Sequence, residues 1–218
     1  MSGTRVVTSI VLIPLLFIVV WFLPPAYFAG LAVIAAVLGQ YELYGMAKTR
    51  GIKPLDTVGF LLGAAIVLEF SRTGINRLGF DLALTCAVLV VLTARLFLRR
   101  AVEGAFEDVA VTLLGILYVA LLFGSQVGIH QGRQGKEWLM FMYLVIWASD
   151  TGAYYVGSAF GKHRLYEKIS PKKSIEGLIG GIAASMLVAV LCKLWLLENL
   201  DWGTAILLGT VLAIAGTV

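Results

Sequence analysis

The sequence has few charged residues for its length. Only 14% of its 218 residues are charged, whereas 60% are hydrophobic and the mean hydropathy is +0.92. A typical soluble domain is about 25% charged and about 45–50% apolar, so this composition excludes a soluble globule with a wettable surface. It also argues against a disordered chain and a nucleic-acid-binding domain, because both need a polar surface. The sequence therefore predicts a protein whose solvent is lipid.

Cysteine is too scarce for a disulfide framework or a cysteine-ligated zinc site. Cys86 and Cys192 are the only two, and each lies inside an apolar run without a C-x-x-C pair or a histidine cluster. We interpret both as small hydrophobic side chains in helices. The P-loop G-x-x-x-x-G-K-[ST], the zinc-protease H-E-x-x-H and the serine-hydrolase G-x-S-x-G are also absent. The function must therefore be sought in other patterns.

Long apolar runs fill most of the chain, and a membrane-spanning helix needs about 20 such residues. The first run follows Arg5 without a small-residue cleavage site, which predicts a retained helix and not a removed signal peptide. We expect an all-α, polytopic transmembrane bundle of about eight helices, forming a single integral-membrane domain over residues 1–218. The predicted spans are 6–23, 26–46, 56–71, 80–98, 108–129, 138–160, 175–197 and 202–218.

The distribution of Lys and Arg predicts the orientation, because these residues collect on the cytoplasmic side of short loops. With the N-terminus inside, twelve of the 17 cations fall on the inner side. They are Arg5, Lys48, Arg50, Lys53, Arg95, Arg99, Arg100, Lys162, Arg164, Lys168, Lys172 and Lys173. We therefore expect both ends of this sequence, and the basic loop 162–173, to be cytoplasmic.

Asp150 is the most informative acidic residue. It lies twelve residues into the 138–160 span, which places it about 18 Å along a helix. A carboxylate at that depth costs at least about 2.5–3.5 kcal/mol, so it should face the bundle interior or a wet cavity. It could pair with a neighbouring helix, but a metal ligand or a catalytic carboxylate is the preferred interpretation. Tyr154 follows one turn later on the same helix face.

Glycines and lysines gather beside Asp150. Gly157 with Gly161, and Gly177 with Gly181, form two G-x-x-x-G pairs, which permit close helix packing and leave a homodimer open. Ser170 and Pro171 are typical of a helix N-cap and first helical residue, so we expect a helix to start there. Lys172 and Lys173 would then lie in its first turn and oppose the helix dipole. A bound phosphate would resolve that conflict. Alternatively, the two lysines could merely reflect the excess of cations on the cytoplasmic side, or they could contact anionic lipid headgroups.

The residues from Ser149 to Gly181 resemble a known family. The stretch S-D-T-G-A-Y-Y-V-G, followed by F-G-K-H-R-L and I-S-P-K-K-S-I-E-G-L-I-G-G, is similar to the corresponding block of the phosphatidate cytidylyltransferases, the CDP-diacylglycerol synthases of bacterial membranes. Arg5 before V-V-T-S-I-V-L-I-P and the Glu42 to Pro54 segment are similar to the family's N-terminal part. The resemblance thus covers most of the chain.

The resemblance implies a Mg²⁺-dependent enzyme of the inner (cytoplasmic) membrane that transfers CMP from CTP to phosphatidic acid and releases pyrophosphate. It implies that Asp150 binds Mg²⁺ and that Lys172 and Lys173 act in catalysis on phosphate oxygens. The substrate-binding residues would be Lys162, Arg164, Ser170 and Tyr154.

The family's C-terminal signature, S-x-x-K-R-x-x-x-x-K-D with H-G-G and a D-R-x-D cluster, is not in this sequence. We therefore expect the 218 residues to carry part of the site and to turn over weakly or not at all. Other functions remain open: a polyprenol kinase, an archaeal-lipid cytidylyltransferase or a small transporter. A transporter would spread polar residues along a path across the membrane, whereas here the cations and the deep acid gather on the cytoplasmic half, which favours an enzyme.

Overall fold

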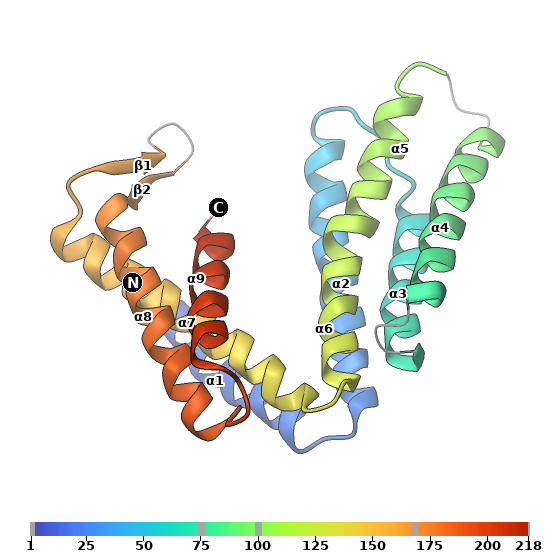
Figure 1. The fold of residues 1–218 in the computed structure, drawn as a ribbon. Coiled ribbons are helices and arrows are strands. Elements are labelled where there is room, and N and C mark those ends of the chain that lie inside the picture. The colour runs from blue at the N-terminus through green and yellow to red at the C-terminus, as the bar shows by residue number, and fades with distance from the viewer. Residues whose placement is uncertain (1–2, 74–76, 99–101, 167–169, 218) are drawn as a thin grey trace. The chain divides into compact units, whose positions relative to one another are not determined.

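The computed structural model describes residues 3–73, 77–98, 102–166 and 170–217, and these are almost entirely helical (Figure 1). The chain divides into two compact units, residues 1–136 and 137–218. The helices of the first part of the chain are α1 (Gly3–Trp21), α2 (Pro25–Lys48), α3 (Asp56–Thr73), α4 (Arg77–Phe97), α5 (Ala105–Leu114), the π-helical segment η1 (Gly115–Ala120) and α6 (Leu121–Gln131). The second part contains α7 (Gly135–Phe160), the strands β1 (Arg164–Tyr166) and β2 (Ser170–Ser174), α8 (Ile175–Trp195) and α9 (Trp202–Thr217).

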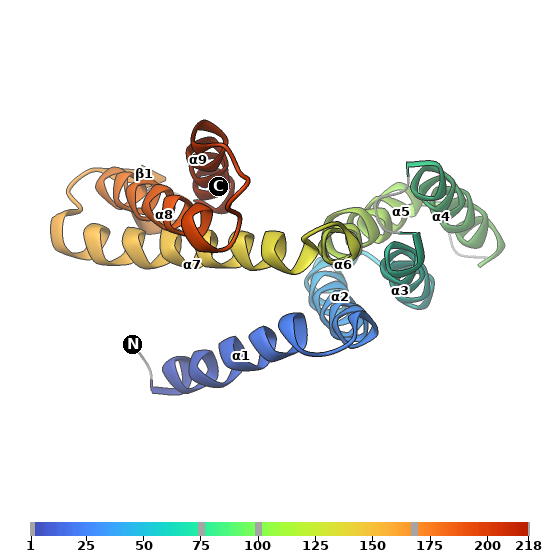
Figure 2. The same ribbon diagram turned by 60° about the horizontal axis from the view of Figure 1, so that its bottom comes forward.

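The helix pattern confirms the expected helical membrane fold. Because α5, η1 and α6 are continuous (Figure 2), the described residues form eight unbroken helices, each overlapping one predicted span. Three of these helices are long and apolar enough to cross a membrane by length and composition: Pro25–Lys48, Ala105–Gln131 and Ile175–Trp195. Hydropathy did not predict the β1–β2 hairpin, because strands this short leave no signal in the hydropathy pattern.

The core of the first unit is built on α2, whose sequence sets both its start and its buried face. Pro24 and Pro25 suit the helix start, since the first helical N–H has no intrahelical partner. Small or aromatic side chains then recur about every four residues on the buried side. Gln40 Nε2 on this face donates to the Gly59 carbonyl oxygen of α3 at 3.0 Å. The helix therefore packs by close approach and by a polar contact with α3.

Tyr44 of α2 reaches the helix that contains the π-helical segment. Its hydroxyl donates to the Thr112 carbonyl oxygen at 3.0 Å. A Cβ placed at Gly59 or Gly115 would collide with the Tyr44 ring, so only glycine fits at both positions. A π-helical turn frees a carbonyl from the regular helix ladder, and Thr112 precedes that turn. The buried phenol is thus accommodated by two glycines and a local change of helix type.

The loop between α2 and α3 is attached to α5 by one acid. Asp108, only 5% exposed, accepts from the Lys53 backbone N at 2.7 Å and from Arg95 Nε at 3.2 Å. The Leu55 backbone N donates to Thr112 Oγ1 one turn further along α5. A buried carboxylate is tolerated where its charge is paired and its oxygens accept hydrogen bonds. This pairing fixes the loop 49–55 against α5.

The last turn of α1 is completed by side chains from distant sequence. His130 Nε2 lies 3.0 Å from the Val20 carbonyl oxygen, and Lys136 Nζ donates to the Trp21 carbonyl oxygen at 2.8 Å. The His130 ring also packs on Phe28, with ring centroids 5.0 Å apart. Carbonyls at a helix C-terminus have no intrahelical partner, so these side chains satisfy two of them.

In the second unit, α7, α8 and α9 pack through small residues. A Cβ at Gly181 would lie 3.0 Å from the Ser149 carbonyl oxygen, and one at Gly209 would lie 2.9 Å from the Ala189 Cβ. Glycine and alanine at such crossings let helix backbones approach closely in lipid. Close packing of α7 against α8 brings the end of α7 beside the start of α8, where the candidate site lies.

Candidate functional site

The basic loop after α7 forms an antiparallel hairpin and not a helix start. Arg164 pairs with Ser174 and Tyr166 pairs with Ser170, with an irregular register between them. The predicted helix start at Ser170 and Pro171 is therefore wrong: both belong to β2, and α8 begins at Ile175. Backbone pairing with β1 overrides the local preference of Ser-Pro for a helix N-terminus.

Ser174 is the N-cap of α8, a role that we predicted for Ser170. Its backbone is extended, and its Oγ accepts a hydrogen bond from the Gly177 backbone N at 3.1 Å. Lys172 and Lys173 consequently lie on the strand before the helix, so they are not in its first turn. The first turn of α8 contains Glu176, which suits the positive end of the helix dipole. The expected conflict between the lysines and the helix dipole does not arise.

The two glycine pairs pack α7 against α8 beside the hairpin. A Cβ built on Gly177 would lie 3.3 Å from the Gly157 Cα and 3.0 Å from the Ala153 carbonyl oxygen. A Cβ on Gly161 would lie 2.8 Å from Ser174 Oγ. The predicted close approach is thus confirmed, and it holds the N-cap Ser174, 4% exposed, against the end of α7.

A pocket of about 570 Å³ opens between α7, the hairpin, α8 and the end of α9. This volume falls in the range of about 300–1,000 Å³ that is typical of small-molecule sites. Its lining residues are Asp150, Ala153, Tyr154, Gly157, Ser158, Gly161, Arg164, Leu165, Lys172, Lys173, Ser174, Gly177, Leu178, Gly216 and Thr217. All of them belong to the second unit.

Five of the seven predicted site residues line this pocket: Asp150, Tyr154, Arg164, Lys172 and Lys173. Ser170, which is half-buried in β2, and Lys162, which is exposed in the segment between α7 and β1, are not among the lining residues. Both residues belong to the loop that carries the pocket cations, as predicted, but the hairpin places them outside the pocket lining. The pocket thus combines one acid with three cations.

Asp150 faces the pocket with its carboxylate available. The side chain is exposed, and within the described residues it has no hydrogen-bond or ion-pair partner. This argues against the alternative that Asp150 is merely paired with a neighbouring helix. No group of three or more His, Cys, Asp or Glu side chains able to hold a metal occurs in the described part of the chain. Any cation at Asp150 would therefore need ligands from water or from a bound substrate.

Lys173 differs from Lys172 in that it already has a partner. Its Nζ donates to the Thr217 carbonyl oxygen at the end of α9. Lys172 has no such contact within the described residues and is exposed. The lysine pair thus divides into one residue that joins the hairpin to α9 and one with a free ammonium group at the pocket.

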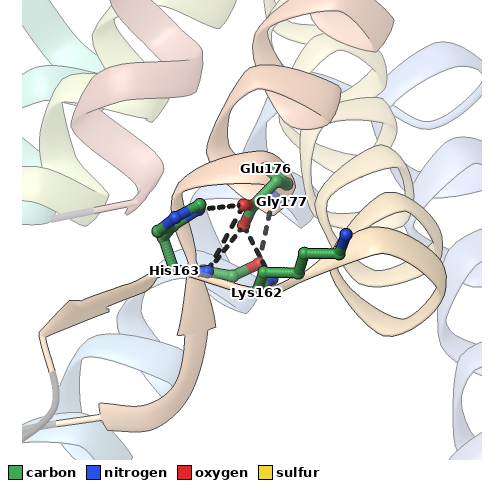
Figure 3. A network of polar contacts seen from close by, with 5 residues as sticks. Lys162, His163, Glu176 and Gly177 are labelled. Atoms are coloured by element: carbon green, nitrogen blue, oxygen red, sulfur yellow. Dashed lines mark hydrogen bonds and ion pairs between the residues drawn. The ribbon is translucent and has the colours of Figure 1, made fainter.

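Sequence reasoning missed the role of Glu176, which binds the segment entering the hairpin (Figure 3). The Glu176 carboxylate accepts hydrogen bonds from the backbone N atoms of Lys162 and His163 and contacts His163 Nδ1. The only sequence signal was an acid in a strongly basic stretch. It became interpretable once the structure showed that α8 begins one residue before it.

The chain matches a known family over nearly its whole length: the cytidylyltransferase family model aligns with residues 3–218. A phosphatidate cytidylyltransferase of Bacillus subtilis (strain 168) is 31% identical over 160 residues, which cover 71% of this chain and 58% of that protein. One of Staphylococcus haemolyticus is 28% identical over 199 residues, covering 89% of this chain and 75% of the relative. One of Staphylococcus aureus (strain COL) is 29% identical over 205 residues, covering 89% and 74%. Because the family model spans residues 3–218, this chain belongs to the cytidylyltransferase family.

Proposed function

We propose that the pocket binds CTP and that the protein transfers its CMP group to phosphatidic acid, giving CDP-diacylglycerol and pyrophosphate. The observation that carries the proposal is the meeting of Asp150, Arg164, Lys172 and Lys173 at one pocket in a cytidylyltransferase-family chain. The relatives named above are phosphatidate cytidylyltransferases. A triphosphate is a polyanion, and three cationic side chains suit its charge.

In the proposed reaction a phosphate oxygen of the lipid attacks the α-phosphorus of CTP. A new P–O bond forms, the bond between the α-phosphorus and the bridging oxygen breaks, and pyrophosphate leaves with the electron pair. Both reactants are anions, so the protein must offset their repulsion and hold them in line. Lys172, Lys173 and Arg164 would bind the phosphate oxygens, and Tyr154 would border the nucleotide on the α7 side.

Nucleotidyltransferases generally use a divalent metal ion, and the donor set here fits Mg²⁺ in one particular way. Mg²⁺ usually keeps several waters and is bound through one or two carboxylates together with substrate phosphates. Asp150 would be the carboxylate that holds it, since its side chain faces the pocket unpaired. When bound, the ion would neutralise charge that develops on the phosphate oxygens.

The protein would act at the cytoplasmic face of the inner membrane, with the pocket on the cytoplasmic side. The positions of the cations support this orientation, since Arg164, Lys172 and Lys173 belong to the largest basic loop. CTP is water-soluble and phosphatidic acid is not, so the pocket must be reached from both phases. The two glycine pairs, which made a homodimer possible, pack α7 against α8 within one chain. Light scattering of the detergent-solubilised protein would measure the oligomeric state.

Two differently labelled nucleotides would test the reaction. The protein is reconstituted in vesicles with phosphatidic acid and Mg²⁺, and the lipid fraction is counted. A cytidylyltransferase places label from [α-³²P]CTP in the lipid, whereas a polyprenol kinase given its own lipid would place label from [γ-³²P]CTP there. We expect α-label only, at the low rate expected of these 218 residues, and a double substitution Lys172→Ala with Lys173→Ala should greatly reduce it.

Arg133→Ala is the matched control for charge removal, since Arg133 is an exposed cation in the turn before α7. It should incorporate α-label like the unmodified protein. Incorporation of γ-label, or no lipid label combined with vesicle uptake of intact nucleotide, would contradict the proposal and favour the kinase or the transporter.

A further inference from the structure

Glu176 joins the two ends of the cationic hairpin (Figure 3). Its Oε2 accepts hydrogen bonds from the backbone N of Lys162 at 3.1 Å and of His163 at 3.2 Å. Its Oε1 lies 2.6 Å from His163 Nδ1. The Ile175 backbone N donates to the His163 carbonyl oxygen at 2.9 Å in the same place. The segment entering the hairpin is thus attached to the first turn of α8 at four points.

These contacts lie at both ends of the segment that carries the three cations of the pocket. Lys162 and His163 precede β1, whereas Ile175 and Glu176 follow β2, so the contacts lie on either side of the two strands. That segment includes Arg164, whose side chain reaches the pocket together with those of Lys172 and Lys173. Glu176 itself is not a lining residue. Its carboxylate does not contact the pocket, but it can influence the pocket through the position of the hairpin.

The hairpin needs such an attachment. A two-stranded hairpin is marginally stable by itself in water, and here one strand has three residues and the other five. The cationic side chains on it repel one another when no anion is bound. A carboxylate that accepts two backbone N–H groups and an imidazole N–H makes stronger, charge-assisted hydrogen bonds. It can hold the cations together before the ligand arrives.

We propose that Glu176 is a positioning residue that fixes the cationic hairpin and thereby sets the affinity of the pocket for the triphosphate of the nucleotide. The inference rests on the function proposed above, in which the hairpin cations bind phosphate oxygens. It adds that the pocket is preorganised by an acid which touches no substrate. Preorganisation raises affinity because less ordering remains to be done on binding.

A purely structural role would have a different signature. An acid in the first turn stabilises a helix through its dipole wherever the hairpin lies. Loss of that role would lower the melting temperature and leave nucleotide affinity unchanged in the folded protein. Loss of positioning would instead loosen the hairpin and raise KM for CTP, with kcat nearly unchanged because the reacting groups remain.

The substitution Glu176→Gln separates these roles, since it keeps the size of the side chain and removes its charge. Trypsin cleavage after Lys162, Arg164, Lys172 and Lys173 measures the opening of the hairpin without any need for activity. We expect cleavage there to become about tenfold faster, and both the Kd and KM for CTP to rise about tenfold, as the loss of charged hydrogen bonds commonly gives. Glu176→Asp, with the charge kept on a shorter side chain, should give intermediate values.

Glu198→Gln is the matched control, because Glu198 is an exposed acid beyond the other end of α8. It should match the unmodified protein in cleavage, Kd and KM. Adding His163→Ala to Glu176→Gln should cause little further change, since both substitutions break the same contact.

Equal hairpin cleavage in the unmodified protein and in Glu176→Gln would overturn the positioning role, whatever the nucleotide results. Faster cleavage with an unchanged Kd for CTP would also overturn it, because the hairpin would then not determine affinity. If the unmodified protein does not bind CTP, the proposed function fails. The cleavage comparison would still show separately whether Glu176 holds the hairpin.

Discussion

Asp150 is an acid in a pocket whose other charged lining residues are Arg164, Lys172 and Lys173. An acid surrounded by cations could serve only to neutralise them, but no ion pair or hydrogen bond to Asp150 occurs in the described part of the chain. Its carboxylate is exposed to the pocket. These features fit a ligand for a divalent cation that arrives with the nucleotide better than a structural counter-ion.

Asp150→Asn should lower the rate of CDP-lipid formation at least about 100-fold, because stabilisation by a metal ion amounts to several kcal/mol and each 1.36 kcal/mol is tenfold in rate. The asparagine side chain has the same shape, so the protein should fold and its melting temperature should change little. Initial rates at saturating CTP and a Mg²⁺ titration would measure the effect. Asp81→Asn, at an exposed position on α4, is the control and should be fully active. An active Asp150→Asn protein would remove Asp150 from the catalytic set.

At the level of elements, the packing of α7 against α8 determines where the pocket residues lie. Gly152 is a tight point of this packing that is not itself part of the pocket: a Cβ there would lie 2.6 Å from the Ala184 Cβ and 2.7 Å from the Gly180 carbonyl oxygen. A backbone carbonyl cannot rotate away as a flexible side chain can. The two helices would have to separate to admit a methyl group.

Gly152→Ala should therefore destabilise the protein by about 1–3 kcal/mol, the usual cost of overpacking. The expected result is a lower melting temperature in detergent. Gly45→Ala on α2 is the matched control, since no atom lies within 4 Å of its new Cβ; alanine is the better helix former, so stability should be unchanged or slightly raised. A Gly152→Ala protein as stable as the unmodified one would show that α7 and α8 separate without cost.

The elements that hydropathy predicted and those it missed differ in physical origin. Each helix lies close to its predicted span, for example α3 (Asp56–Thr73) for 56–71 and α8 (Ile175–Trp195) for 175–197, because apolar run length is set by the membrane. The hairpin was missed because pairing of residues 164–166 with 170–174 is a nonlocal event. The preference of Ser170 and Pro171 for a helix start was a local signal that this pairing overrode. The position of Glu176 could be interpreted only after the true start of α8 was known.

For the whole molecule, the asymmetry of charge predicts how the chain lies in the bilayer. The predicted inner side carries twelve of the 17 Lys and Arg residues, including the whole basic loop 162–173. Alternation of the helices then places the 132–134 turn, with the exposed Arg133, on the outer side. The pocket would face the cytoplasm, where CTP is found.

Single cysteines would test this orientation in a chain whose Cys86 and Cys192 are replaced by alanine. Lys162→Cys should react with a membrane-impermeant maleimide only in inverted vesicles, and Arg133→Cys only in right-side-out vesicles. Both side chains are exposed, so neither is shielded by protein. The reverse pattern would contradict the topology, and labelling of both from one side would mean that the 138–160 span does not cross.

The completion of α1 by His130 and Lys136 has a consequence for biosynthesis. The acceptor Val20 carbonyl precedes His130 by 110 residues, and the Trp21 carbonyl precedes Lys136 by 115. The ribosome therefore makes α1 before these partners, which follow only after α2, α3, α4 and nearly all of the continuous helix from α5 to α6 have been translated. Until then the end of α1 must rely on interfacial water for those two carbonyls. The end of α1 thus reaches its final contacts only after a long further stretch of chain has been made.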